Sequence, residues 1–87
     1  MALRLRPHDP RLLAQSAWVW LESGDPTQAR RVAEQALARE PREWVAWAVL
    51  ARASKVLGDA TLAERAAGLA RELAPPEART LLDGLLR

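Results

Sequence analysis

The sequence of 87 residues contains an internal repeat, and this repeat constrains the fold more than any other feature. When residues 10–43 are aligned with residues 44–77, 11 of the 34 positions are identical. Chance gives about four identities in a sequence this rich in Ala, Leu and Arg. The identities fall mainly at small, turn and proline positions: Ala14/Ala48, Ala17/Ala51, Gly24/Gly58, Asp25/Asp59, Thr27/Thr61, Ala29/Ala63, Arg31/Arg65, Ala33/Ala67, Ala36/Ala70, Pro41/Pro75 and Glu43/Glu77. A period of this length indicates stacked supersecondary units.

Glycine, aspartate and proline divide each unit into two helices. Gly24-Asp25 and Gly58-Asp59 follow apolar segments, a pattern typical of one helix end followed by the N-cap of the next helix. Pro41 and Pro75 end the second helix of each unit, because proline disfavours helical geometry in the residue before it. Abundant Ala and Leu, with no Phe or Tyr, favour helices over strands. These signals predict helices over residues 9–22, 26–39, 43–57, 60–73 and 76–86.

Each unit resembles the tetratricopeptide repeat, whose pattern is W-x2-L-G-x2-Y, then A-x3-F, then P. The second unit reads Trp47-x2-Leu50-Ala51-x2-Ser54, Ala63-x3-Ala67, Pro75, and the first reads Leu13-x2-Ser16-Ala17-x2-Trp20, Ala29-x3-Ala33, Pro41. The aromatic positions depart from the pattern, since Ser54 stands for Tyr and alanines stand for Phe. The resemblance implies an all-α fold, a short right-handed solenoid of antiparallel helix hairpins. An ordinary antiparallel helical bundle is the alternative. The RNA-reading pentatricopeptide repeat has a period of 35 and fits less well.

The repeat boundaries predict a single domain over residues 1–87. Its parts are a partial N-terminal segment (1–9), repeat 1 (10–43), repeat 2 (44–77) and a C-terminal capping helix (76–87). The capping helix is predicted because Leu81, Leu82, Leu85 and Leu86 form one apolar stripe.

Residue types that carry catalysis or bind metals are scarce. There is no Cys and a single histidine, His8, in a predicted turn, so thiol chemistry and a two-histidine metal site are excluded. No serine lies in a Gly-x-Ser-x-Gly motif, and the glycines are isolated rather than grouped in a phosphate loop. The sequence therefore predicts no enzyme, no cofactor and no metal. The absence of a long apolar run or an apolar leader predicts no membrane partner and a cytoplasmic location.

Tryptophans and cations supply the candidate binding residues. Trp20 and Trp47 are expected to pack in the interior, together with Leu12, whereas Trp18 is expected to point away from that apolar stripe. In tetratricopeptide repeats the first helix of each pair lines a concave groove. The resemblance therefore implies that Trp18, its equivalent Arg52, Arg11 and Lys55 face this groove. An aromatic side chain with three cations suits an acidic or C-terminal peptide. The sequence leaves the role of Trp44 open.

The leading functional prediction is a non-catalytic module that binds a protein partner's peptide or helix in the groove. The family's chaperone-carboxylate clamp is rejected, because the chain contains no Asn for it. An alternative is self-association as a homodimer through Trp18 and Val19 on an exposed N-terminal helix. Nucleic-acid binding through arginines is a remote alternative, because the 13 basic and 11 acidic residues are interleaved rather than clustered, and no nucleic-acid partner is predicted.

Overall fold

Five α-helices and one short 3-10 helix form the protein, in a computed structural model that describes residues 9–86. The helices are α1 (Pro10–Glu22), α2 (Pro26–Arg39), α3 (Trp44–Val56), α4 (Ala60–Leu73) and α5 (Arg79–Leu86), with η1 (Pro76–Ala78) before α5. The five predicted helices are thus confirmed, with one difference. The helix predicted over 76–86 opens with a separate 3-10 turn, in which the amides of Ala78 and Arg79 donate to the carbonyl oxygens of Pro75 and Pro76, three residues back.

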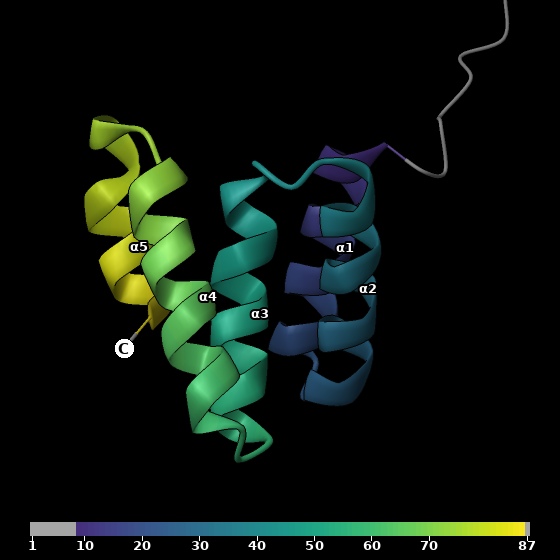
Figure 1. The fold of residues 1–87 in the computed structure, drawn as a ribbon. Helices are drawn as coiled ribbons and strands as arrows, with labels where there is room; N and C mark the ends of the chain where they lie inside the picture. Colours follow the sequence, from purple (N-terminus) through teal and green to yellow (C-terminus); the bar gives the residue numbers. More distant parts are fainter. Residues whose placement is uncertain (1–8, 87) are drawn as a thin grey trace, which may run out of the picture.

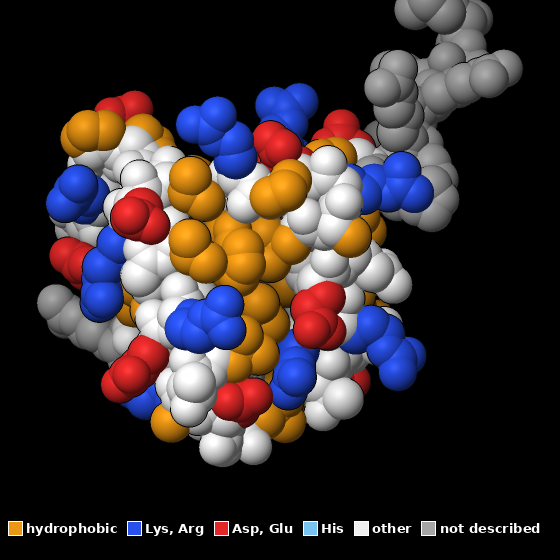
Figure 2. Space-filling model, viewed as in Figure 1, with side chains coloured by type: hydrophobic (Ala, Val, Ile, Leu, Met, Phe, Trp, Pro, Cys, Tyr) orange, Lys and Arg blue, Asp and Glu red, His pale blue; other side chains and the backbone are white. Residues whose placement is uncertain are grey.

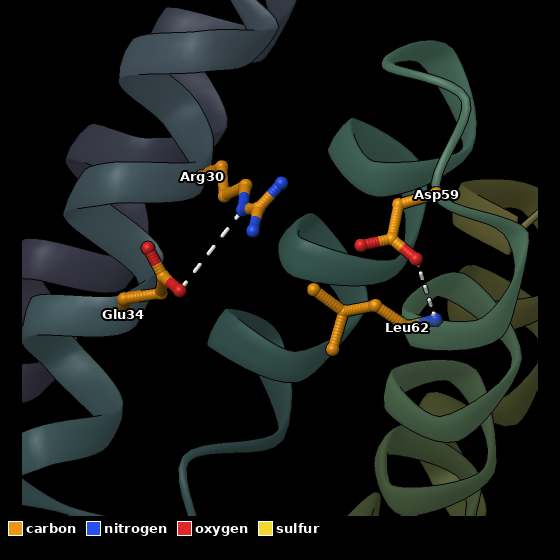
Figure 3. Close-up of polar contacts among 4 residues, drawn as sticks. All are labelled: Arg30, Glu34, Asp59 and Leu62. Carbon is orange, nitrogen blue, oxygen red and sulfur yellow. Dashed lines mark hydrogen bonds and ion pairs between the residues drawn. The ribbon is translucent and has the colours of Figure 1, made fainter.

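The two Gly-Asp turns have the same geometry in both repeats. Gly24 and Gly58 adopt φ of 86° and 88°, the left-handed conformation that ends a helix. In each turn the glycine and the following aspartate donate backbone hydrogen bonds to the end of the preceding helix. Each aspartate carboxylate then accepts a bond from the next helix, as Asp59 does from the Leu62 amide at 3.1 Å (Figure 3). The turn therefore both ends one helix and starts the next.

Adding a methyl group to two glycines is expected to change stability in opposite directions. Neither Gly58 nor Gly68 has a neighbour within 4 Å of an added Cβ, so only the backbone distinguishes them. We expect Gly58→Ala to lower the free energy of unfolding by about 1 kcal/mol, because a side chain strains a left-handed residue. We expect Gly68→Ala, inside α4, to raise it by about 0.7 kcal/mol. Urea denaturation measures both, and equal effects would contradict the argument.

The helices stack in chain order. Helices α1 and α2 pair, α3 and α4 pair, and α3 also contacts α1 and α2, while α5 covers part of α3 and α4 (Figure 1). Within the described residues α1 contacts neither α4 nor α5. Contacts limited to neighbouring units are typical of a repeat array rather than of a closed bundle. The predicted all-α repeat fold, with a capping helix, is confirmed.

The interior consists mostly of alanine. A first cluster of buried residues joins α1, α2, α3 and α4, and a second joins α3, α4 and α5. Small residues allow the helices to approach closely, which is why the family's large aromatic positions can be alanine here. Figure 2 shows the margin of this interior as hydrophobic side chains gathered between α2 and α4, over α3.

Candidate functional site

Helix α5 ends beside α4 (Figure 1), and a hollow in the surface is lined by residues of α3, α4 and the end of α5. Its volume is about 280 Å³. It lies among α3, α4 and the last residue of α5, and its lining residues are Ala51, Arg52, Lys55, Ala60, Ala63, Glu64, Ala67 and Leu86. We call this hollow the terminal trough.

The internal repeat shows which surface of the first repeat the terminal trough corresponds to. In the repeat alignment, Leu86, the last described residue, corresponds to Arg52 of α3, and α3 continues to Val56. The described part of α5 therefore does not extend as far along its neighbour as α3 does. The alanines Ala29 and Ala33 of α2 are fully buried. Their α4 equivalents in the trough are only half-buried. The alanines of the trough thus correspond to a helix-packing surface of the first repeat, and the described residues cover them only in part.

Charged side chains border this alanine floor. Arg52 and Lys55 are exposed on the α3 side, and Glu64 is exposed on the α4 side. Arg52 also lines a neighbouring pocket with Glu22 and Leu21 at the end of α1. The trough carries one more positive than negative charge. Its shape and charge suit an apolar side chain that is accompanied by a carboxylate.

The structure brings together only two of the four predicted partner-binding residues. Arg52 and Lys55 share the terminal trough, whereas Arg11 and Trp18 do not line it. Arg11 lies instead near Glu43, at the start of α3. Burial raises the pKa of the Glu43 carboxyl, and a backbone hydrogen bond at Val45 and the Arg11 charge both act against that rise. The terminal trough therefore contains two of the four predicted residues, and neither Arg11 nor Trp18 lines it.

The prediction of which face of α1 is buried is wrong. Trp18 is half-buried and packs against the first core cluster instead of pointing away from it. Leu12 and Trp20, expected inside, are 38% and 40% exposed. The reason is that α1 carries apolar residues on two faces, and the alanines Ala14 and Ala17 mark the face that packs closely. Large side chains on the other face cannot pack that closely.

The other tryptophan predictions have clearer outcomes. Trp47 packs against both core clusters, as expected of an interior residue, and its indole Nε1 donates to the Pro41 carbonyl oxygen at 2.7 Å. Trp44, whose role the sequence does not define, packs against the second cluster. His8 lies outside the described residues.

Sequence reasoning missed the α4 and α5 contribution to the trough. Ala60, Ala63, Ala67 and Leu86 are apolar, and nothing in the sequence pattern distinguishes them from ordinary helix positions. No signal in the sequence reveals them, because their exposure depends on how α5 packs against α4.

Polar contacts elsewhere add no second site. The Arg30–Glu34 pair on α2 is exposed, with 4.0 Å between Nε and Oε2, and contributes little (Figure 3). Among residues 9–86, no three His, Cys, Asp or Glu side chains gather to hold a metal ion. In the same part of the chain, every helix is too short or too polar to span a bilayer.

Comparison with known proteins gives three findings. The tetratricopeptide repeat family matches residues 20–85. Tetratricopeptide repeat protein 33 of Mus musculus is 36% identical over 74 residues, which cover 85% of this chain and 28% of the mouse protein. The chain thus matches little more than a quarter of that relative's length. No solved structure matches the chain.

Proposed function

Because the chain belongs to the tetratricopeptide repeat family, we propose that it is a non-catalytic module that binds a peptide or helix of a partner protein in the terminal trough. Tetratricopeptide repeats mediate protein–protein interactions. The observation that carries the choice of surface is the alanine floor of the trough, half-buried where the equivalent alanines of α2 are fully buried. A cytoplasmic place of action is part of the same proposal.

The lining of the trough supports one type of ligand. A leucine-sized side chain would cover Ala63 and Ala67. A carboxylate beside that side chain would meet Arg52 and Lys55. The ligand is therefore a short apolar segment with acidic flanks, in extended or helical form.

Two probe peptides test this proposal. Both have a central Leu-Ala-Ala-Leu segment, and one has glutamates at both ends where the other has lysines. In a nuclear magnetic resonance titration, we expect the glutamate peptide to shift the amide signals of Ala60, Ala63 and Ala67. We expect Arg52→Glu to weaken its binding about tenfold, because attraction becomes repulsion. Arg31→Glu makes the same charge change at an exposed position of α2, outside the trough, and should leave binding unchanged.

Four outcomes would contradict the proposed peptide binding in the terminal trough. Shifts confined to residues outside the trough would place the ligand elsewhere. Equal binding of both peptides, or equal weakening by Arg52→Glu and Arg31→Glu, would remove the role of the cations. An absence of shifts with either peptide at millimolar concentration would remove the trough as a peptide site.

Self-association is a second candidate function. It is favoured by α1, on which Val19 is 60% exposed. Trp18, proposed from the sequence as a contact residue with Val19, is a weaker candidate because it packs inward. Nucleic-acid binding is disfavoured, because positive and negative side chains are mixed on the face seen in Figure 2.

A further inference from the structure

One face of α1 carries large apolar side chains that no described element covers. Leu12, Val19 and Trp20 are 38%, 60% and 40% exposed, and Ser16 lies exposed among them. We call these four residues the α1 outer face. Positions 12, 16 and 20 are spaced by one helical turn each, so they form one stripe along the helix.

The internal repeat shows that this position on the helix is normally a packing surface. In the repeat alignment, the α1 outer face corresponds to Ala46, Leu50, Ala53 and Ser54 of α3. All four α3 residues are at most 3% exposed, and α3 packs on α2. The first helix of the second repeat therefore buries the very face that the first helix of the first repeat exposes.

A helix shaped like α2 is a poor occupant for the α1 outer face. The side-chain sizes in the two repeats are inverted: Leu12 stands for Ala46, Ser16 for Leu50, and Trp20 for Ser54. A surface complementary to α3 would clash with the large side chains of Leu12 and Trp20 at the two ends of α1, and it would leave a gap at Ser16 in the middle. The occupant must instead make room for large residues at the ends and approach closely at Ser16.

A second copy of α1 meets this requirement when it runs antiparallel. Two antiparallel helices related by a two-fold axis at Ser16 place Leu12 of one copy opposite Trp20 of the other. The small serines meet where the helices cross, and the large residues lie where the helices diverge. The pattern is therefore self-complementary, as an isologous contact requires.

The charges of α1 favour the same orientation. Its cation, Arg11, lies at the start of the helix, and its anion, Glu22, lies at the end. Both are exposed and lie on the same side of α1, because they are about three turns apart. An antiparallel pair places Arg11 of each copy at the level of Glu22 of the other along the helix axis, whereas a parallel pair would place like charges at the same level.

We propose that the α1 outer face binds a second copy of this chain as an antiparallel, two-fold symmetric helix pair. This inference rests on the second candidate function and is independent of peptide binding in the terminal trough. One helix face against itself buries less than a standard interface of about 1,600 Å², so we expect a dissociation constant of about 0.1 mM.

A single introduced thiol tests the inference directly, because the full chain contains no cysteine. We expect the thiol of a Ser16→Cys variant to react with a maleimide reagent about fourfold more slowly at 1 mM than at 5 μM protein. Mild oxidation at 1 mM should link two chains. Leu81→Cys, on the exposed side of α5, is the matched control and should show neither effect.

Charge reversal tests the orientation by sedimentation equilibrium. Glu22→Arg should weaken association about tenfold, and adding Arg11→Glu to it should restore the original affinity. The double variant also controls for the effect of Glu22 on Arg52, which lines the same pocket. Trp20→Asp should abolish association at 1 mM, whereas Leu81→Asp should not.

Three results would contradict the proposed antiparallel pair, and each points to a different explanation. Protection of the Ser16→Cys thiol at every concentration would place another segment of the same chain on the α1 outer face. Protection at no concentration would show an unoccupied face. Association without rescue by the double variant would exclude the antiparallel pair. Each result would overturn this inference and leave peptide binding in the terminal trough unaffected.

Discussion

Replacing Leu82 with alanine is expected to lower the free energy of unfolding by about 3 kcal/mol. Leu82 is 1% exposed and is the large member of a buried cluster whose other members, Ala48, Ala70 and Ala74, are alanines. Helix α5 has only 8 residues and is too short to be stable alone, so its docking depends on this side chain. Its removal leaves a cavity that alanine neighbours cannot fill.

The neighbouring residue provides the control for this prediction. Leu81 is 62% exposed, so Leu81→Ala should change the free energy of unfolding by less than about 0.5 kcal/mol. Chemical denaturation measures both variants, and hydrogen exchange should show α5 amides losing protection in Leu82→Ala alone. A loss below about 1 kcal/mol for Leu82→Ala would show that α5 contributes little to the fold.

The fold could be predicted because the residues that define it act locally. A left-handed glycine, an aspartate cap and a helix-ending proline each act within a few residues of their own position. Because the same residues recur in the second repeat, the helix boundaries of both repeats follow from the same local signals. The separate 3-10 turn at Pro76 could not be predicted from these local signals.

The candidate surfaces could be predicted only in part, because exposure depends on which neighbours are absent. The placement of Arg52 and Lys55 on one candidate binding surface could be predicted from the resemblance to the repeat family. The half-buried alanines beside them could not be predicted, since Ala63 and Ala67 are identical in sequence to their buried equivalents Ala29 and Ala33, and only the packing of the helices distinguishes them. The sequence pattern predicts that Trp20 is buried and Trp18 is exposed, whereas in the structure Trp18 packs inward and Trp20 is exposed. The prediction is wrong because α1 has two apolar stripes, and the sequence of α1 alone does not show which of them is buried.

Replacing Trp47 with alanine is expected to lower the free energy of unfolding by about 3 kcal/mol, the lower end of the usual range because the side chain is half-buried. Trp47 packs against both core clusters, so it links the first repeat to the capping helix. Its indole N–H also holds the Pro41 carbonyl in the turn between α2 and α3. Both the packing between repeats and the turn that joins them depend on this one side chain.

Two further variants separate the contributions of Trp47. Trp47→Phe keeps an aromatic ring and removes the hydrogen-bond donor, so we expect a loss of about 1 kcal/mol, leaving the Pro41 carbonyl to water. Trp20→Ala removes an indole that is 40% exposed, and we expect a loss below about 1 kcal/mol when it is measured at micromolar concentration, well below the dissociation constant expected for the proposed helix pair. Urea denaturation of the three variants should therefore rank Trp47→Ala first, with the largest loss, followed by Trp47→Phe and then Trp20→Ala. If Trp47→Phe costs as much as Trp47→Ala, the hydrogen bond to the turn dominates, and the packing of Trp47 does not link the two clusters.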